Sequence, residues 1–480
     1  MDTKKLRQKI LDLAIHGKLV PQDPNDEPAS VLLERIRAEK ERLIAEGKIK
    51  RSKKSATSDT SHYENVPFEV PESWEWTTLG ELCSFLSRGK SPKYSEERKY
   101  PVFAQKCNLY DGDISLEKAR FLDPETISKW SDEYKLIDGD ILVNSTGTGT
   151  VGRTRLFHSD VLGDYPFVVP DSHISVVRSF EEIESKFVLA FLSSDYGQTY
   201  IEDNLAGSTN QKELYIGVLD NMQFPLPPHE EQFRIVTTVD KWFSLIDTLE
   251  SVKEDLQTSI TQAKSKILDL AIHGKLVPQD PNDEPASELL KRINPKFVPC
   301  DNAHYENVPN SWCWTTLGEV CELITGSTPS KLHPEYYGGD FPFYKPTDLD
   351  VGRHVAIPSE FLTGEGKKVS RVIPVGATAI CCIGSIGKCG YIEKEGATNQ
   401  QINTAVPSKS LHPLYLYYFC NSTFFVEELT ADSSAITISI VNKSKLSKML
   451  IPIPPYKEQQ RIVTKIEKLL VVLDNISAEL

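Results

Sequence analysis

The sequence predicts an α+β protein with two mixed α/β globular domains, separated by long antiparallel coiled-coil helices and related by an internal pseudo-two-fold repeat. Three observations lead to this prediction: segments that occur twice in circularly shifted order, long apolar stripes at helical spacing, and short β-rich runs between them. With 480 residues, the chain is too long for one ordinary core and can form two to four domains.

Four sequence blocks occur twice, and the longest is identical in both copies. KILDLAIHGKLVPQDPNDEPAS stands at 9–30 and again at 266–287. In the middle of the chain, the last helix of the first half runs directly into the second copy of this block. At the two ends of the chain the same pieces are split, which predicts a pseudo-two-fold axis between the halves. The other three blocks are HYENVP at 62–67 and 304–309, SWEWTTLGELC at 73–83 against SWCWTTLGEVC at 311–321, and the stretches 224–249 and 451–476.

The helical segments follow from the spacing of apolar residues. Between 236 and 270 these residues fall three or four positions apart, which is typical of a packed helical stripe. The stripe predicts one helix from Glu230 to His273, about 65 Å long at about 1.5 Å per residue, ended by Gly274. Similar stripes precede Gly17 and fill the C-terminus. Their length favours antiparallel coiled-coil pairing over a single helix lying on a globular core.

The remaining elements are shorter. A helix is expected between Pro28 and Gly47, followed by a basic and then polar loop, KIKRSKKSATSDTS, whereas Pro295 shortens the counterpart of this helix. Runs such as DGDILVNS, HISVVR and ATAICCIG, broken by Gly, Pro and Asp, predict short strands. The expected boundaries are an N-terminal helical segment at 1–61, globular domains at 62–224 and 304–451, a central helical spacer at 225–303 and a C-terminal helix at 452–480.

Composition and charge exclude several classes of protein. The net charge of −14 argues weakly against a nucleic-acid partner, because binding depends on a local basic patch rather than on the total. Nine cysteines without a CxxC pair predict reduced thiols in a cytoplasmic protein, and no metal site. No apolar run is long enough for a membrane span, and the N-terminus lacks the apolar core of a secretory signal, so no membrane partner is expected.

The sequence contains no convincing catalytic set. GTGTVGRT, from Gly147 to Thr154, is similar to a phosphate-binding loop, but the segment after it is not a long helix, which such a loop requires. A glycine-rich hairpin that presents polar side chains is favoured over a nucleotide-hydrolysing site. IPPY at 453–456 lacks the Asn, Asp or Ser that amino-methyltransferases place before Pro-Pro, and it is interpreted as the turn that starts a helix.

Polar and basic loops recur at corresponding places in the two halves. Asn, Gln, Arg and Lys are the side chains that read base edges, and Ser and Thr mostly bind phosphates. The recurrence favours DNA contact over ordinary solvated loops. The candidate DNA-contact residues are Arg88, Lys90, Lys93, Ser145, Thr146, Thr148, Thr150, Arg153, Thr209, Asn210, Gln211 and Lys212 in the first half, and Thr328, Ser330, Lys331, Ser385, Lys388, Asn399, Gln400 and Gln401 in the second.

Taken together, the motifs resemble the DNA-specificity subunit (S subunit) family of Type I restriction–modification systems across essentially the whole chain. The resemblance rests on AIHGKLVPQDPNDEPAS, SWEWTTLGELC, ILVNSTGTGTVGR, ATNQQIN and PLPPHEEQFRIV, in that circular order. It implies two target recognition domains, each reading one half of a bipartite site on double-stranded DNA. It also implies that the helices between them fix the gap between the two half-sites.

The same resemblance implies the partners of the chain. Two copies of the modification (methyltransferase) subunit dock on the helices, and restriction subunits join that core. The S subunit itself has no catalytic activity, and S-adenosylmethionine, ATP and Mg²⁺ belong to the partner subunits. The alternative from another class is a coiled-coil scaffold that bridges two identical partner proteins without reading DNA.

The identical stretch has two explanations that one sequence does not separate. It forms a twin docking site for two copies of one partner, or recent sequence exchange between the copies has kept it identical. Under the docking hypothesis, the two histidines of the stretch have no catalytic role, and they are expected to cap a helix end or to pack against neighbouring residues. Its candidate residues are His16, Lys18, Gln22, Asp23, His273, Lys275, Gln279 and Asp280.

Overall fold

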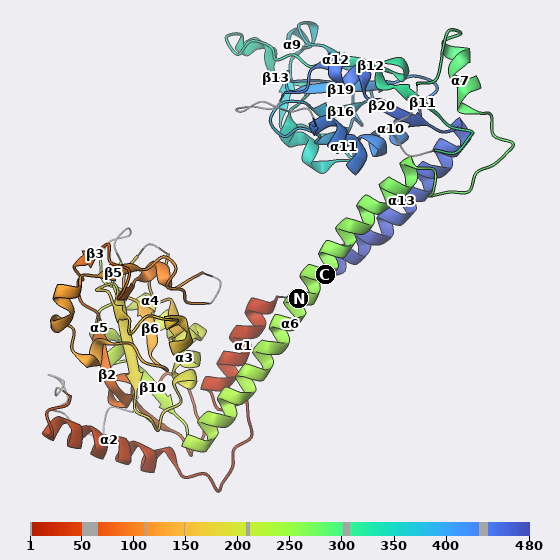
Figure 1. Ribbon diagram of the computed structural model, residues 1–480. Coiled ribbons are helices and arrows are strands. Elements are labelled where there is room, and N and C mark those ends of the chain that lie inside the picture. The colour runs from red at the N-terminus through yellow and green to blue at the C-terminus, as the bar shows by residue number, and fades with distance from the viewer. Residues whose placement is uncertain are drawn as a thin grey trace. The chain divides into compact units, whose positions relative to one another are not determined.

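The computed structural model describes residues 2–49, 66–110, 113–147, 149–207, 212–300, 308–431 and 440–480. The chain divides into two compact units, Met1–Ser251 and Val252–Leu480. Each unit contains a globular domain with β-sheets and a pair of helices (Figure 1). Residues 50–61 of the predicted basic and polar loop lie outside the described residues.

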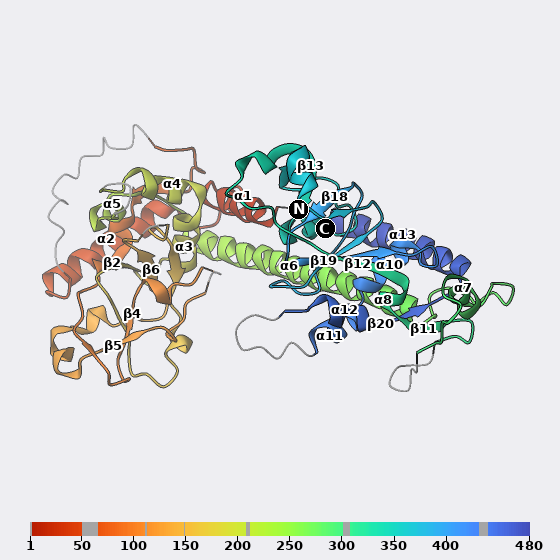
Figure 2. The same ribbon diagram turned by 90° about the horizontal axis from the view of Figure 1, so that it is seen from above.

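Helix α6 (His229–Ile272) is the longest helix described, with 44 residues. In the first unit, α1 (Thr3–Ile15) lies antiparallel along its N-terminal part, as Figures 1 and 2 show. Arg7 on α1 forms ion pairs with Asp247 at 2.6 Å and with Glu250 at 3.1 Å on α6. The predicted pairing of the helical stripes is confirmed for this unit.

In the second unit, the later part of α6 pairs in the same way with α13 (Tyr456–Glu479). Lys264 forms an ion pair with Asp474 at 2.5 Å, and Ser477 donates a hydrogen bond to Gln257 at 3.0 Å. Because α6 residues of lower number meet α13 residues of higher number, this pair is also antiparallel. The pseudo-two-fold axis between the two halves stays a prediction.

The shorter helices agree with their predicted limits. α2 (Ala29–Ala45) follows Pro28, and its counterpart α7 (Ala286–Ile293) ends before Pro295. The other helices are α3 (Ser185–Ser193), α4 (Asp195–Asp203), α5 (Ile216–Asp220), α8 (Leu317–Val320), α9 (Gly364–Lys368), α10 (Pro413–Cys420), α11 (Thr423–Thr430) and α12 (Lys443–Lys448).

Each globular domain contains two four-stranded sheets and one two-stranded sheet. In the first unit they have the strand orders β2-β9-β6-β7, β3-β5-β4-β8 and β1-β10. The strands are β1 (Glu75–Thr78), β2 (Cys83–Arg88), β3 (Tyr94–Ser95), β4 (Pro101–Phe103), β5 (Arg120–Leu122), β6 (Ile141–Asn144), β7 (Thr154–Leu156), β8 (Val169–Pro170), β9 (Ile174–Ser179) and β10 (Gln223–Leu226).

The second unit has the strand orders β12-β19-β16-β17, β14-β13-β18-β15 and β11-β20. Two of these sheets repeat the first unit, whereas the sheet with β13 has its fourth strand, β15, beside β18, and the sheet with β4 has its fourth strand, β3, beside β5. Both units contain one parallel pair, β4 with β8 and β13 with β18. The predicted α+β fold with two sheet-containing domains and long paired helices is confirmed. The strands are β11 (Cys313–Thr316), β12 (Cys321–Thr325), β13 (Tyr337–Tyr344), β14 (Glu360–Leu362), β15 (Val372–Ile373), β16 (Thr378–Cys381), β17 (Cys389–Tyr391), β18 (Gly396–Thr398), β19 (Ile402–Pro407) and β20 (Leu450–Ile453).

A buried polar cluster joins the helices to the globular domain in the first unit. Glu231, in the first turn of α6, is 1% exposed and accepts hydrogen bonds from Gln22 Nε2 at 2.6 Å and Trp74 Nε1 at 3.0 Å. Arg234 pairs with Asp26 at 2.5 Å beside it. Burial raises the pKa of Glu231 above its ordinary value, and the bonds from Trp74 and Gln22 act in the opposite direction. The cluster therefore holds three separate chain segments together.

The second unit contains the counterpart of this cluster. Gln279 Nε2 donates to Glu458 at 2.6 Å, and Arg461 pairs with Asp283 at 2.6 Å. Trp312 stands at the position of Trp74 and faces Glu458, but its indole nitrogen has no hydrogen-bond partner of normal geometry among the described residues. Both halves thus attach their globular domain to the helices through the same side-chain types.

Two glycines permit the chain to turn sharply after α1 and after α6. Gly17 and Gly274 have φ of +64° and +66°, the left-handed region that favours glycine. A Cβ atom at either position would come within 2.4 Å of a proline Cγ, in Pro71 or Pro309. These glycines therefore satisfy a backbone requirement and a packing requirement at once.

We predict that Gly17→Ala lowers stability more than Gly47→Ala. Gly47 has a φ of +72° and nothing within 4 Å of its Cβ position, so its replacement costs about 1 kcal/mol through the backbone alone. Gly17→Ala adds the collision with Pro71, for about 1–3 kcal/mol more. Thermal unfolding of the two variants measures the difference, and equal losses would contradict the packing argument.

We also predict a pH-dependent loss of stability for Trp74→Phe. The indole N–H stabilises the charged form of Glu231, so its removal costs about 1–3 kcal/mol at neutral pH. This contribution is lost as pH falls through the raised folded pKa of Glu231, so the variant approaches the wild type in acid.

Urea unfolding at neutral and acid pH provides the measurement. Trp76→Phe is the control, because Trp76 packs edge-on against Phe68 and lies outside the cluster. A loss for Trp74→Phe that does not change with pH would show that only packing is lost.

Candidate nucleic-acid interface

The backbone register brings two predicted contact loops of the first unit, and the loop before β9, to one end of a sheet. β9 lies between β2 and β6, and it pairs antiparallel with both, with Arg88 opposite Ser175 and Asn144 opposite Ile174. The loop after β2, the turn after β6 and the loop before β9 therefore leave the sheet at the same end. We call this end the first contact edge.

Side-chain contacts link these loops to each other. Arg88 forms an ion pair with Glu213 and donates to the carbonyl of Ser172. Thr146 Oγ1 lies 2.7 Å from His173 Nδ1. Lys212, next to Glu213, is exposed. The structure thus gathers predicted residues that are far apart in the sequence, and it gives Arg88 a carboxylate partner.

The two lysines beyond β2 are also engaged. Lys90 Nζ lies 3.9 Å from the centre of the Tyr134 ring and donates to the carbonyl of Lys129 at 3.0 Å. Lys93 pairs with Asp123 at 2.6 Å, and the pKa of Asp123 is lowered chiefly by that bond. A phosphate group would have to compete with these partners for either lysine.

The glycine-rich turn after β6 contains both surface and buried residues. Ser145 is fully buried and bonds to Ser175 Oγ at 2.6 Å, so it belongs to the framework of the edge rather than to its surface. Thr150 Oγ1 donates to the Thr146 carbonyl at 3.4 Å. Arg153 donates to the carbonyl of Asn108 at 2.7 Å and remains partly exposed. Thr148, Thr209, Asn210 and Gln211 lie outside the described residues.

The second unit forms an equivalent second contact edge. Thr325 lies opposite Asn403, and Cys381 lies opposite Ile402. Thr328 donates to Gln400 across this edge. It gathers residues from the loop after β12 and from the loop between β18 and β19.

Within the second edge, the loop 399–401 is held by its own side chains. Asn399 Oδ1 accepts from the Gln401 backbone N–H at 3.1 Å, and Asn399 Nδ2 donates to Gln401 Oε1 at 2.9 Å. Lys388 pairs with Asp350 at 2.5 Å. The predicted residues Ser330, Lys331, Ser385 and Gln400 are all exposed.

The predicted docking residues mostly make local bonds. His16 and His273 each approach a backbone carbonyl one helical turn back, at 2.7 Å. Gln22 and Gln279 bind the buried glutamates described above. Asp23 and Asp280 accept bonds from the N–H two residues ahead, at 2.9 Å in both copies, whereas Lys18 and Lys275 are exposed. Internal structure is therefore a further reason for the identity of these positions.

Sequence reasoning missed several residues of the two edges. His173 occupies the place of Gln401, since both stand directly before the aligned strands β9 and β19. Aligning SHISVV with the NQQINTAV stretch was sufficient to find it. Gln105, Glu213 and Asp350 carry no such signal, because only the fold brings them to the edges.

The geometry gives no support for catalysis at the rejected motifs. The segment after GTGTVGRT forms the short strand β7 rather than a helix. The Pro-Pro turns lead directly into α6 and α13, as expected. All nine cysteines are free thiols, and the described residues contain no cluster of three or more His, Cys, Asp or Glu side chains suited to a metal.

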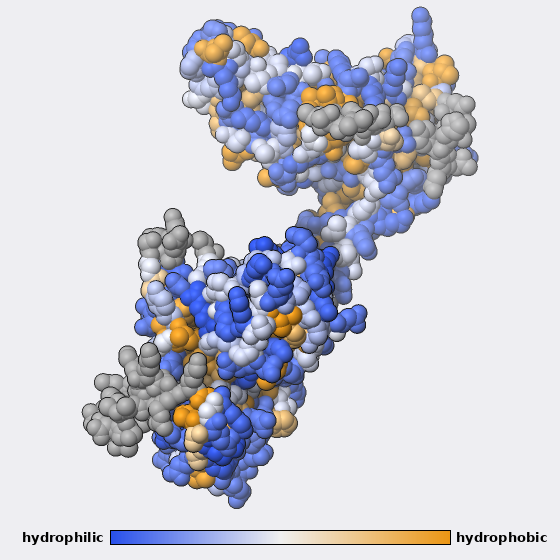
Figure 3. Space-filling view, turned by 60° about the vertical axis from the view of Figure 1, so that its left-hand side comes forward, coloured by the Kyte–Doolittle hydropathy of each residue, from blue (hydrophilic) through white to orange (hydrophobic). Residues whose placement is uncertain are grey.

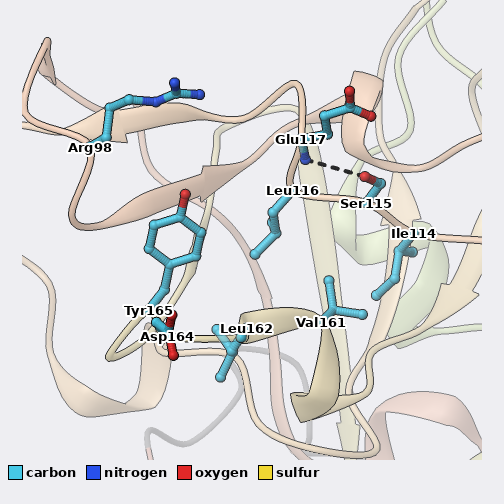
Figure 4. A pocket seen from close by; sticks show the side chains of 10 residues that line it. Arg98, Ile114, Ser115, Leu116, Glu117, Val161, Leu162, Asp164 and Tyr165 are labelled. Carbon is cyan, nitrogen blue, oxygen red and sulfur yellow. Dashed lines mark hydrogen bonds between the residues drawn. The ribbon is translucent and has the colours of Figure 1, made fainter.

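A hollow of about 630 Å³ lies in the first unit, away from the predicted contact residues. Figure 4 shows Leu116, Val161 and Tyr165 pointing into it, with Arg98 at its rim. Figure 3 shows hydrophobic residues in small separate groups on the face that it displays. In the part of the chain that is described, no helix combines the length and the apolar character needed to cross a membrane.

Comparison with known proteins identifies the family. The model of the Type I restriction modification DNA specificity domain matches residues 71–258 and 309–479, once in each half. The chain is 27% identical to the Type I restriction enzyme EcoEI specificity subunit of Escherichia coli, over 99% of this chain and 90% of that protein. It is 28% identical to the EcoAI specificity subunit of Escherichia coli, over 97% and 89%.

Solved structures show the same fold. A chain from a study of Type I restriction–modification complex assembly aligns with a TM-score of 0.57 at 19% identity, covering 86% of this chain and 95% of that one. The HsdS subunit of Thermoanaerobacter tengcongensis aligns with a TM-score of 0.51 at 19% identity, covering 86% and 93%. With the family match in both halves, the chain belongs to the Type I restriction modification DNA specificity family and is a non-catalytic specificity subunit, which recognises DNA sequence for a Type I restriction enzyme.

Proposed function

We propose that the chain reads a bipartite and asymmetric site on double-stranded DNA, one half-site through each contact edge. The observation that carries this proposal is the repeated register, which projects three loops from the same end of the corresponding sheet in both units. We retain residues 62–224 and 304–451 as the two target recognition domains. Two readers of this kind suit half-sites spaced by about one helical turn, roughly 34 Å.

The chemistry of the two edges supports different half-sites. Asn144 lies opposite Ile174, the first residue of β9, and Cys381 lies opposite Ile402, the first residue of β19. Thr146 and Ile383 each lie two residues later, so they correspond. His173 corresponds to Gln401 in the same way. Thr146 and His173 both have hydrogen-bonding side chains, whereas Ile383 has none and Gln401 offers an amide, so the two edges select different bases.

We further propose that two copies of the modification (methyltransferase) subunit bind the helices, and that restriction subunits join this core in the cytoplasm. S-adenosylmethionine, ATP and Mg²⁺ then bind to the partner subunits. The support is a pair of exposed apolar residues at matching positions of both helices. Leu245 and Leu249 on α6 are 48% and 50% exposed, and Val472 and Ile476 on α13 are 52% and 40% exposed.

These apolar pairs fit a twin docking site better than the buried part of the identical stretch does. When a partner covers leucine, valine and isoleucine side chains that are this exposed on a helix, the burial lowers the free energy of the complex. The residues occupy equivalent places in the repeated blocks 224–249 and 451–476. Exposed Lys18 and Lys275, which lie beyond the ends of α1 and α6, remain candidates from the identical stretch.

We predict that Arg153→Ala and Lys388→Ala change different halves of the methylated DNA motif. Each side chain lies at one contact edge, and the loss of one specific base contact removes about 1–3 kcal/mol of discrimination, or roughly tenfold or more. Long-read mapping of methylated adenines in a host that expresses the complex measures both half-sites at once.

The pair of variants serves as its own control, because each should leave the half-site of the other intact. Uniform loss of methylation at all sequences would mean that these residues hold structure or contact phosphates. A wild-type complex that binds random duplexes without any sequence preference would instead favour the scaffold alternative.

We predict that the two apolar pairs each govern one modification subunit. Leu245→Glu with Leu249→Glu should reduce binding from two copies to one, and adding Val472→Glu with Ile476→Glu should abolish it. Loss of two buried aliphatic contacts corresponds to about 3–6 kcal/mol, or at least roughly 100-fold in affinity. Native mass spectrometry counts the bound subunits.

Thr237→Glu is the control for docking, because it adds one glutamate at an exposed position of α6 outside the pair. It should leave two subunits bound. If the fourfold variant also binds two copies, the apolar pairs are not part of the docking surface.

A further inference from the structure

Three polar side chains of the first contact edge form a hydrogen-bonded relay that ends at the surface. They are Gln105 in the 3-10 helix Gln105–Cys107, Thr146 in the turn after β6, and His173 in the loop before β9. No two of them are close in the sequence. The fold therefore assembles the relay, and its last member, His173, is exposed.

The orientation of the Gln105 amide follows from its partners. Its nitrogen Nε2 donates to the carbonyl oxygen of Thr146 and, at 2.6 Å, to Thr146 Oγ1. A carbonyl oxygen only accepts hydrogen bonds, so the amide nitrogen and not the amide oxygen must face it. Both protons of this nitrogen are then in use.

The next bond favours one tautomer of His173. Because Thr146 Oγ1 accepts from Gln105, its own proton is available for His173 Nδ1, which lies 2.7 Å away. A neutral imidazole whose Nδ1 accepts a hydrogen bond carries its proton on Nε2. The relay thus leaves an N–H donor on the outer nitrogen of His173.

The backbone of His173 is also held in place. Its N–H donates to the carboxylate of Asp171 at 2.8 Å, and Asp171 is 5% exposed. Gly147 lets the turn approach Gln105, because a Cβ there would lie 2.9 Å from Gln105 Oε1 and 2.4 Å from Thr150 Oγ1. With ring and backbone both anchored, His173 loses little conformational entropy when its outer nitrogen binds a ligand.

We propose that His173 reads a purine of the first half-site, with its Nε2–H donating to N7 in the major groove. Gln105 and Thr146 are positioning residues, which act by fixing the tautomer and orientation of His173. The inference rests on the proposed function, and it adds the residue, the atom and the base edge. N7 is the major-groove acceptor that adenine and guanine share, and a single outward N–H donor can bind it.

The second contact edge cannot build the same relay. The register of β4 with β8 and of β13 with β18 aligns Phe103 with Tyr344, so Gln105 corresponds to Pro346. Ile383 replaces Thr146, and neither proline nor isoleucine has a side-chain hydrogen-bonding group. Gln401, in the place of His173, bonds instead to Asn399. The relay is therefore specific to the first half-site, and Gln401 provides a matched control.

The test uses the full chain in complex with its modification subunit. Methylation mapping first defines the motif, and binding is then measured on duplexes in which 7-deazaguanine or 7-deazaadenine replaces one purine at a time. For the wild type, removal of N7 at one purine of the first half-site should weaken binding about tenfold, as expected for one specific hydrogen bond. His173→Ala should show the same loss on normal DNA and no further loss on the 7-deaza duplex.

Two further variants separate the reading residue from its positioning residues. Thr146→Val removes the proton donor to Nδ1 and keeps the shape of the side chain, and Thr146→Ser restores the donor. ¹⁵N NMR of selectively labelled histidine should report the Nε2–H tautomer of His173 in the wild type and in Thr146→Ser, and a mixture of tautomers in Thr146→Val. Base discrimination at that purine should fall in Thr146→Val and recover in Thr146→Ser.

The outcomes distinguish this inference from the function on which it rests. Unchanged motif and unchanged 7-deaza sensitivity in His173→Ala would overturn the inference and leave sequence reading intact. A wild type that shows no sensitivity to any 7-deazapurine in the first half-site would overturn it as well. Failure of the wild-type complex to prefer any sequence would refute the proposed function itself. Gln401→Ala should alter only the other half-site, which confirms that effects are assigned to the correct edge.

Discussion

The buried carboxylates of Glu231 and Glu458 hold each half of the molecule together. A charge removed from water requires hydrogen-bond donors, and each glutamate obtains one from a glutamine that lies beyond the end of α1 or α6. These hydrogen bonds attach the start of α6 to the segment after α1, and the start of α13 to the segment after α6. Because Trp74 and Trp312 lie against the same carboxylates and directly precede the first strands, the globular domain is attached at this point as well.

This attachment separates the framework from the reading surface. The clusters and the turn glycines use the same side-chain types in both halves, and the β1–β10 and β11–β20 ladders have the same antiparallel register. The contact edges lie at the far ends of other strands, where side chains can change without disturbing the core. A changed loop at a contact edge therefore leaves in place the side-chain contacts that pair the helices.

The acidity of the chain is also reconciled with DNA recognition at the contact edges. Several cations there already have carboxylate partners, as Arg88 has Glu213 and Lys388 has Asp350. A cation held by a neighbouring carboxylate is positioned for directional contact, and its contribution to nonspecific phosphate attraction is reduced. Under the proposed function, much of the phosphate contact falls to the partner subunits, so the net charge of −14 does not oppose it.

The sequence by itself determined the repeat, the limits of the long helices, the short strands and the family, because these features depend on local spacing and on nearly identical blocks. It also identified most segments of the contact edges, since the loops recur at matching places. It did not identify which side chains meet there. Ser145 looked like a surface residue yet is buried against Ser175. Gln105, Thr146 and His173 meet only because β4 and β6 end close to where β9 begins. Hydrogen bonds between residues distant in sequence depend on strand register and on backbone turns, and only the tertiary structure decides these.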